Sequence, residues 1–181
     1  MTKYPQKTIG ELCNIIKGET GISSATPGEY PLVVTAKERK TSATYQFDTQ
    51  AVCIPLVSSS GHGKKSLNYV HYQEGKFALA TILAAVIPKK HDEIYAAFLN
   101  SNYGIRNAIS YTTGVGSSQG NLNVNRVRPY VIPLPPLAEQ KAIVEKVDYL
   151  IKIIDQLEAQ IKHRKQLAEE LMPTVLTETF E

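Results

Sequence analysis

The chain has 181 residues, of which 43% are hydrophobic and 20% charged, and its formal net charge at pH 7 is +3. No apolar run is long enough to span a membrane, and residues 1–6 lack the apolar stretch of a signal peptide, so we expect a cytoplasmic protein without a membrane segment. Cys13 and Cys53 each lie in an apolar stretch, which predicts buried thiols in a reducing compartment rather than a disulfide framework.

Charge is distributed unevenly along the chain. Residues 1–132 contain 14 Lys and Arg against 8 Asp and Glu, whereas residues 133–181 contain 6 against 9. The first part therefore carries a net charge of +6 and the second a net charge of −3. This asymmetry predicts two domains with different partners: a basic domain over 1–132 that faces a polyanion, and an acidic segment over 133–181 that faces another protein.

The first part is predicted to be a mixed α+β domain with a twisted, largely antiparallel sheet and short helices. Residues 9–17 predict a helical turn followed by a strand, and residues 18–28 a polar loop rich in Gly, Ser and Thr. Asp92 is expected to cap a helix over 93–100, and a second short helix is expected over 103–110. Further strands are expected at 32–34, 45–47, 52–57, 68–72, 77–79, 83–87 and 130–132.

The catalytic and cofactor motifs that the sequence suggests all fail on spacing or composition. Residues 61–66 read Gly-His-Gly-Lys-Lys-Ser, like the end of a phosphate-binding loop, but Ser58 stands where the first glycine is required. The glycines at 114, 116 and 120 do not fit a dinucleotide fingerprint, and the four histidines have no His or Cys companions at metal-ligand spacing. No adenine-methyltransferase tetrad and no defensible Ser-His-Asp set is present. We therefore expect a non-catalytic protein with no cofactor and no metal.

Three polar loops remain as candidates for contact with nucleic acid. Small residues allow close approach of the backbone, Lys neutralises phosphates, Gln and Asn pair with adenine, and Arg pairs with guanine. Each loop alone is equally compatible with a solvated surface turn, but three such loops in one basic domain favour DNA. The candidate DNA-binding residues are Lys37, Arg39, Lys40, Ser60, His62, Lys64, Lys65, Ser118, Gln119, Asn121, Asn123 and Arg126.

The second part predicts one long helix after a proline-rich segment. Pro136 suits the first helical position and Glu139 the first turn, and the next proline, Pro173, is expected to stop or kink the helix at Met172. Apolar residues recur at alternating intervals of four and three, the pattern of a coiled coil, along a rod of roughly 54 Å. The predicted dimerisation positions are Ile143, Val147, Leu150, Ile154, Leu157, Ile161, Ala168 and Leu171.

Two departures from the heptad pattern carry information. Arg164 interrupts the apolar seam and is expected to pair with a glutamate of a partner helix. Val144, Ile151 and Ile153 widen the apolar stripe, which indicates contact with more than one neighbour. The alternative interpretation is an ordinary amphipathic helix that lies on its own domain.

Four segments of the chain resemble the specificity subunit of type I restriction–modification enzymes. The most specific is the proline-to-helix junction, which reads Pro133-Leu134-Pro135-Pro136-Leu137-Ala138-Glu139-Gln140-Lys141-Ala142-Ile143-Val144. Two more look like its target-recognition domains: Ile9-Gly10-Glu11-Leu12, and the stretch from Gly61-His62-Gly63 to Glu74-Gly75-Lys76-Phe77-Ala78-Leu79. The fourth, Leu171-Met172-Pro173-Thr174-Val175-Leu176, looks like the end of its conserved helix.

This resemblance implies a DNA-recognition subunit without catalytic activity of its own. In such a subunit, the target-recognition domain reads one half of a split site in double-stranded DNA. The conserved helix sets the spacing between the halves and docks methyltransferase (M) subunits, and restriction (R) subunits join the larger complex. A full subunit has two such domains and two such helices, so the resemblance implies that this chain is a half subunit, natural or truncated.

A single exposed seam needs a partner. We expect a homodimer in which two long helices pair antiparallel and the recognised site is palindromic. Two other interpretations stay open: a recognition domain cut from a fused restriction–methyltransferase, and a coiled-coil adaptor that does not bind DNA. A coding region that extends upstream into methyltransferase motifs identifies the first, and silent mutation of Lys64, Lys65 or Arg126 identifies the second.

Overall fold

The computed structural model describes residues 3–36, 38–58, 70–101, 104–105, 120–121 and 124–180. Contacts within the chain divide it into two compact units, Met1–Lys141 and Ala142–Glu181, which we call the sheet domain and the helical unit. The proline-rich segment and the first turn of the long helix belong to the sheet domain. The predicted boundary at residue 132 separates a DNA-binding part from a protein-binding part, and it stays a prediction.

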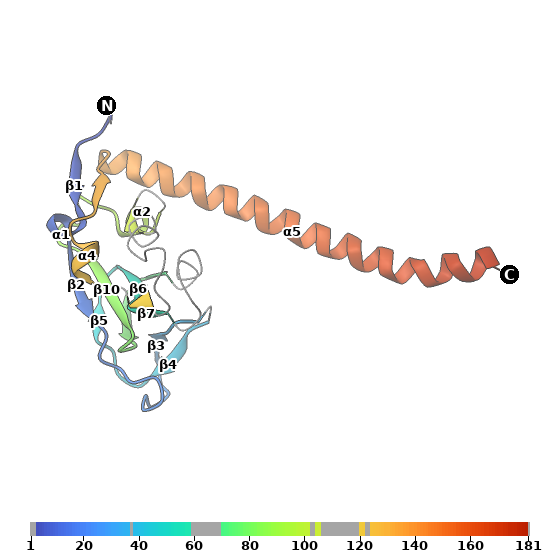
Figure 1. Ribbon diagram of the computed structural model, residues 1–181, viewed down its shortest axis with the longest axis horizontal. Helices are drawn as coiled ribbons and strands as arrows, with labels where there is room; N and C mark the ends of the chain where they lie inside the picture. The colour runs from blue at the N-terminus through green and yellow to red at the C-terminus, as the bar shows by residue number, and fades with distance from the viewer. Residues whose placement is uncertain are drawn as a thin grey trace. The chain divides into compact units, whose positions relative to one another are not determined.

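Two four-stranded sheets form the body of the sheet domain (Figure 1). The first is antiparallel throughout, in the order β2-β10-β6-β8. Its strands are β2 (Cys13–Lys17), β10 (Leu83–Pro88), β6 (Ala51–Pro55) and β8 (His71–Gln73). The second has the order β4-β3-β9-β5 and contains one parallel pair, β3 with β9. Its strands are β4 (Lys40–Ser42), β3 (Tyr30–Val33), β9 (Lys76–Leu79) and β5 (Phe47–Asp48).

Two short ribbons and three short helices are also described in this domain. β1 (Gln6–Thr8) pairs antiparallel with β12 (Val131–Pro133), so the start of the chain lies beside the segment that leads into the long helix. β7 (Val57–Ser58) pairs antiparallel with β11 (Gly120–Asn121). The helices are α1 (Ile9–Leu12), α2 (Ala96–Leu99) and α4 (Val124–Val127). The predicted α+β class, with largely antiparallel pairing, is therefore confirmed.

Apolar side chains of the central strands make the core. All five residues of β6 are buried, because β6 lies between two neighbours in its sheet and is covered on both faces. Such a strand reads as a continuous apolar run in the sequence. Phe77 of β9 is fully buried and stacks on Phe47 of β5, with ring centroids 5.2 Å apart. Removal of this apolar surface from water is the main source of the domain's stability.

The opening segment folds as its sequence predicts. α1 is a single turn, and β2 follows directly after it. Thr8 caps α1 by accepting a hydrogen bond from the Glu11 backbone N–H, and the Glu11 carboxylate accepts one from the Thr8 N–H at 2.7 Å. This reciprocal capping box satisfies two backbone donors that a helix N-terminus otherwise leaves open.

Two expected elements differ in extent. Residues 52–57 form parts of two strands, because β6 pairs with β10 and β8 whereas β7 pairs with β11 in a separate ribbon. The helix predicted over 93–100 is only α2, and Tyr95 rather than Asp92 occupies its N-cap, so that expectation is wrong. The reason is that the Tyr95 N–H donates to the Gln140 side chain, which keeps Tyr95 extended. Most of the helix expected over 103–110 lies outside the described residues.

The helical unit is the greater part of one helix, α5 (Leu137–Phe180). It begins one residue later than expected, and the Pro136 carbonyl accepts the Gln140 N–H at 3.0 Å. Of the two outcomes expected at Pro173, the stop is wrong, since α5 continues through Pro173 to Phe180 (Figure 1), and the kink stays a prediction. Proline removes one backbone donor and crowds the preceding turn, which bends a helix without always ending it. In the described part of the chain, no helix has the length and hydropathy that crossing a membrane requires.

Candidate nucleic-acid interface

A two-stranded ribbon joins two of the three predicted DNA-contacting loops at their bases. β7 ends at Ser58, where the loop containing residues 58–65 begins. β11 lies within the amide-rich segment 116–126. The register pairs Gly120 with Ser58 and Asn121 with Val57. Two segments about sixty residues apart in the sequence are therefore neighbours in the fold, which the sequence alone did not predict.

Few of the candidate residues in these two loops belong to the described part of the chain. The backbone of Asn121 belongs to β11, and that of Arg126 belongs to α4. The candidate residues outside the described part of the chain are Ser60, His62, Lys64, Lys65, Ser118, Gln119 and Asn123, together with Lys37 of the third loop. The structure thus shows where these two loops leave the sheet domain. The proposed contacts with DNA bases stay predictions.

Arg39 connects the third loop to the same region of the domain. Its Nε donates to the Gln73 side chain at 3.2 Å, and its Nη2 donates to the Tyr72 carbonyl at 3.5 Å. Tyr72 and Gln73 belong to β8, the edge strand that pairs with β6, and β6 leads into β7. Arg39 is therefore fixed to the edge of the sheet beside β6, the strand that leads into the β7–β11 ribbon. Burial lowers the pKa of the Arg39 guanidinium, although arginine keeps its charge at any physiological pH.

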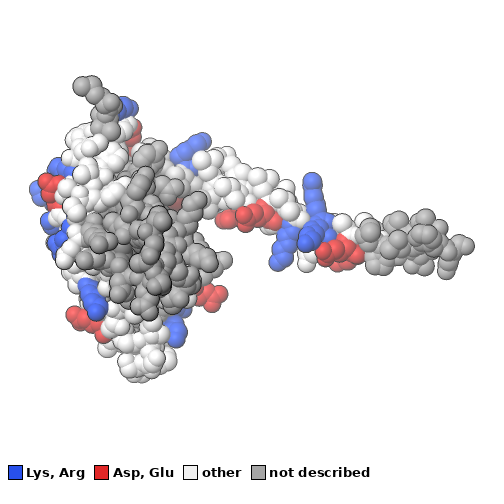
Figure 2. All heavy atoms as spheres, in the orientation of Figure 1, with Lys and Arg blue, Asp and Glu red and all other residues white. Residues whose placement is uncertain are grey.

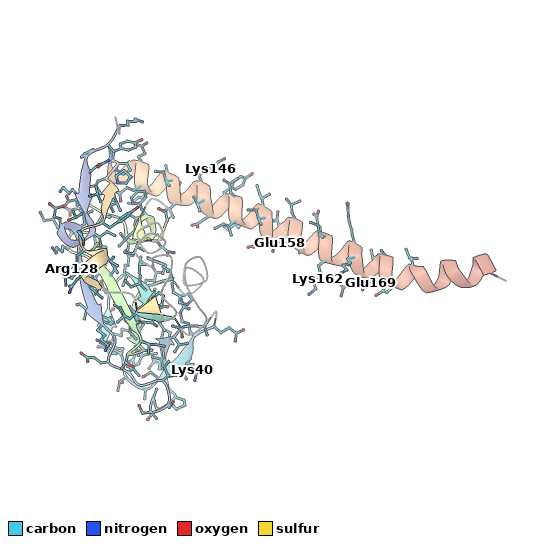
Figure 3. The ribbon with its side chains drawn as sticks, in the orientation of Figure 1. Lys40, Arg128, Lys146, Glu158, Lys162 and Glu169 are labelled. Atoms are coloured by element: carbon cyan, nitrogen blue, oxygen red, sulfur yellow. The ribbon has the colours of Figure 1, made fainter. Side chains whose placement is uncertain are left out.

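Lys40 is exposed at the start of β4, and Arg128 lies on another side of the domain (Figure 3). A group of cations surrounds α1, where Lys and Arg side chains follow the left edge of the domain (Figure 2). Lys89 donates from its Nζ to the Gly10 carbonyl at 2.6 Å, and Lys7 forms an ion pair with Glu93. Part of the positive charge of residues 1–132 is therefore engaged in holding the fold together, which weakens net charge as an argument for DNA.

Both cysteines are unsuited to act as nucleophiles or metal ligands. Burial raises the pKa of the Cys13 thiol to about 12 and that of the Cys53 thiol to about 12. Because the thiolate is the reactive form, these thiols are protonated and unreactive at neutral pH. Within the ranges that the structure describes, no group of three or more His, Cys, Asp or Glu side chains is arranged to hold a metal ion.

The predicted dimerisation seam is exposed in the single chain. Val147, Leu150, Ile154, Leu157, Ile161 and Leu171 are between 40% and 67% accessible to solvent, and Ile143 is half-buried. The labelled charged side chains of the helical unit, such as Lys146, Glu158 and Lys162, extend away from the helix (Figure 3). Lys165 and Glu169 form an ion pair one turn apart, at 3.9 Å, which supports the helix weakly. An apolar stripe of this length on a charged helix is typical of an interaction surface.

Gln140 has a structural role that the sequence analysis missed. It is fully buried, in the first turn of α5. Its Nε2 donates to the Pro135 carbonyl at 2.9 Å and to the Glu93 carbonyl at 3.0 Å, and its Oε1 accepts from the Tyr95 N–H at 2.9 Å. The neighbouring Glu139 accepts a hydrogen bond from the Tyr4 hydroxyl and lies 3.8 Å from the Lys3 ammonium. The signal in the sequence was a pair of polar residues in the first helical turn after the proline-rich segment, separated from Pro136 by Leu137 and Ala138.

Comparison with known proteins places this architecture in a family. Residues 1–164 match the family described as type I restriction modification DNA specificity domain. The chain is 34% identical over 71 residues to the EcoKI specificity subunit of Escherichia coli K12, an alignment that covers 36% of this chain and 15% of that protein.

The fold is similar to that of solved specificity subunits. A crystal structure of the specificity subunit from M. genitalium matches with a TM-score of 0.64 at 18% identity, over 93% of this chain and 44% of that one. A structure from a study of type I restriction–modification complex assembly matches with a TM-score of 0.67, also at 18% identity and over the same shares of the two chains. The chain therefore spans less than half the length of these relatives. It belongs to the family of type I restriction–modification DNA specificity domains.

Proposed function

We propose that this chain is a DNA-recognition module of a type I restriction–modification specificity subunit, without catalytic activity. In this proposal the sheet domain reads one half of a split target in duplex DNA. The long helix binds protein, namely a second copy of itself and methyltransferase subunits, and restriction subunits join through that assembly. The observation that carries the proposal is the β7–β11 pairing in a chain of this family, because it gathers two loops rich in base-reading side chains at one place.

The DNA-binding part of the proposal can be tested by selection. The purified chain is mixed with a library of random duplexes, and the bound fraction is sequenced. We expect enrichment of one short element, since side chains on a small set of loops contact only a few base pairs. A chain that binds duplexes without any sequence preference, or not at all, contradicts recognition and favours the adaptor interpretation.

Two double variants that each remove two lysines test whether the position of the positive charge matters for DNA binding, or only its amount. Neutralising Lys64 and Lys65 to methionine is expected to weaken binding to all duplexes and to lower the salt dependence by about two phosphate contacts. Neutralising Lys152 and Lys162 removes the same charge from exposed positions of α5, outside the sheet domain, and is expected to have a much smaller effect. Equal effects of the two double variants contradict the proposed interface and indicate attraction by net charge alone.

The protein-binding part rests on the exposed seam of α5. Sedimentation of the chain alone is expected to show a dimer at micromolar concentration, and Leu150→Glu with Ile154→Glu is expected to return it to a monomer. Addition of a methyltransferase subunit of a type I restriction–modification system is expected to give a larger complex. A wild-type chain that stays monomeric and ignores methyltransferase contradicts this part while leaving DNA recognition intact.

The relative orientation of the two α5 helices in the dimer, parallel or antiparallel, is tested by a separate experiment. A donor dye at position 146 and an acceptor at position 165 of a second chain report on antiparallel pairing. Two dyes at position 146 report on parallel pairing. We expect a shorter dye-to-dye distance for the first pair than for the second, by roughly 28 Å at a rise of ~1.5 Å per residue, since antiparallel helices bring the start of one α5 toward the end of the other. The reverse result contradicts antiparallel pairing, and with it a spacing between the two half-sites that is set by the length of the paired helices; either orientation keeps the two-fold symmetry of the site.

A further inference from the structure

A polar hollow of about 620 Å³ lies on the sheet domain, apart from the β7–β11 ribbon. The loop over residues 18–28 forms one wall, and the turn between β4 and β5 forms the other. We call it the hydroxyl hollow, since hydroxyl groups are common in its lining. The residues that matter below are Glu19, Thr20, Thr26, Thr44 and Tyr45.

Both walls of the hydroxyl hollow are fixed to the body of the domain. The Gln46 side chain accepts from the Glu19 N–H at 3.0 Å and donates to the Lys17 carbonyl at 3.0 Å, so it ties the start of the loop to the opposite wall. At the other end of the loop, the Ala43 N–H bonds to the Thr26 carbonyl at 2.8 Å. A pocket held in this way is formed before a ligand arrives, which lowers the entropy cost of binding.

Glycine allows the close approach at each end of this loop. A Cβ at Gly18 would lie 2.3 Å from the Ala80 carbonyl oxygen, and a Cβ at Gly28 would lie 2.4 Å from the Ala43 Cα. These distances are shorter than any non-bonded contact allows, so a side chain at either position would push the loop away from its support. The shape of the hollow therefore depends on the backbone, not on a chance arrangement of side chains.

The hydroxyl groups of the lining differ in whether they form hydrogen bonds within the protein. Ser24 and Ser42 are engaged with the backbone, through the Gly21 carbonyl and the Thr44 N–H. By contrast, no hydrogen bond involves the hydroxyls of Thr20, Thr26, Thr44 or Tyr45 among the residues that the structure describes. Four hydroxyls that line one preformed hollow and do not support the fold are available to a ligand.

The rim of the hollow adds an aromatic ring and positive charge. Tyr45 is 44% exposed and packs on Tyr30, and the Lys76 ammonium lies 5.0 Å from the centre of its ring. Lys17 ends β2, next to the loop. β4 begins at Lys40, a predicted DNA contact, and ends at Ser42, which lines the hollow. The hollow is thus continuous along one strand with the third predicted DNA-contacting loop.

We propose that the hydroxyl hollow holds the sugar–phosphate backbone of duplex DNA, through the hydroxyls of Thr26, Thr44 and Tyr45 and the ammonium of Lys76. This proposal rests on the proposed function. Hydroxyl and ammonium groups are the usual donors to phosphate oxygens, and such contacts set the register of a protein on DNA without reading its sequence. Glu19 opposes the interaction, because its carboxylate lines the same hollow and repels phosphate.

The test uses two 40-bp duplexes, one with the selected target and one with the same composition in scrambled order. Thr26→Val with Thr44→Val removes two hydroxyls at constant shape and is expected to weaken binding to both duplexes by about three- to tenfold. Lys76→Met is expected to lower the salt slope by about 1 on both duplexes. Glu19→Gln is expected to tighten binding to both. Thr49→Val, outside the hollow, and Tyr149→Phe, on the helical unit, serve as controls.

The outcomes separate this proposal from the proposed function. If the hollow variants bind both duplexes as tightly as the wild type does, the proposal that the hydroxyl hollow binds the DNA backbone is wrong. The proposed DNA recognition is not affected by that result. A loss confined to the selected duplex overturns the assignment to phosphate and makes the hollow a base-reading site. A wild-type chain that binds neither duplex overturns both proposals. As a measurement free of substitutions, hydroxyl-radical oxidation of Tyr45 is expected to slow when either duplex is added, and an unchanged rate counts against the hollow.

Discussion

The two units of this chain use apolar residues in opposite ways. In the sheet domain, the large apolar side chains of β6, β9 and β10 are withdrawn from water and define the fold. In the helical unit, residues of the same kind remain between 40% and 67% exposed along one stripe. A lone helix has no interior, so such a stripe stabilises nothing until another helix covers it. The fold of the sheet domain therefore depends on contacts within its own sequence, whereas we expect the helical unit to need a partner that covers its apolar stripe.

The largest expected effect contrasts a buried with an exposed apolar residue. Phe77→Ala removes a ring that is fully buried against Phe47, and we expect a loss of about 3–5 kcal/mol in the free energy of unfolding. Leu157→Ala truncates a side chain that is 52% exposed, and at concentrations where the chain is monomeric we expect less than about 0.5 kcal/mol. Urea unfolding followed by tyrosine fluorescence measures both. Similar costs for the two variants would mean that the helical unit is packed within the monomer.

The sequence predicted the parts of the structure that depend on local interactions. Amphipathic periodicity and capping are local, so the order of α1 and β2, most strands and the long helix followed directly from residue types. Pairings between distant segments are not local, and nothing near Ser58 indicates that Gly120 is its partner. The Asp92 cap failed for the same reason, since Tyr95 is held by Gln140, 45 residues away. Individual base contacts were beyond prediction because they depend on loop geometry.

The second prediction concerns the boundary between the two units. Gln140→Met keeps the approximate volume but removes the partners of the Tyr95 N–H and of the Glu93 and Pro135 carbonyls. Only the bond to Pro135 is fully buried, since the other two are partly exposed and water can replace them. We therefore expect a loss of about 1–3 kcal/mol, together with faster hydrogen exchange at the Tyr95 amide.

Gln140→Glu is the matched control for this boundary. It keeps the acceptor for the Tyr95 N–H but places carboxylate oxygens against two carbonyls, so it is expected to be at least as harmful as methionine at neutral pH. If both variants unfold like the wild type, the first turn of α5 does not belong to the cooperative unit of the sheet domain. The division between a self-specified and a partner-specified region would then lie before residue 137.

A smaller effect is expected from the backbone of the sheet domain. Gly75, between β8 and β9, adopts φ of +75°, and a Cβ there would meet no other atom within 4 Å. Gly75→Ala therefore tests backbone conformation without steric clash, and we expect a loss of about 1 kcal/mol. Gly75→Asn is expected to cost less, because asparagine tolerates the left-handed region. Thermal unfolding of the three proteins measures this, and equal melting temperatures would show that the connection is free to rearrange.

The smallest expected effect is a dependence on pH at the first helical turn. Hydrogen bonds from the Thr8 N–H and hydroxyl lower the pKa of the Glu11 carboxyl below its ordinary value of 4.5. A carboxyl with a lowered pKa in the folded state stabilises it above the unfolded pKa, and this contribution disappears as the pH falls through the folded pKa. Glu11→Gln keeps the capping box and removes the titration. The difference in urea midpoint between wild type and this variant is thus expected to be constant from pH 7 to about pH 5 and to decline below it. Because the group is exposed, the decline should be small, and a difference that persists unchanged to pH 3 would show that Glu11 acts through its shape and not through its charge.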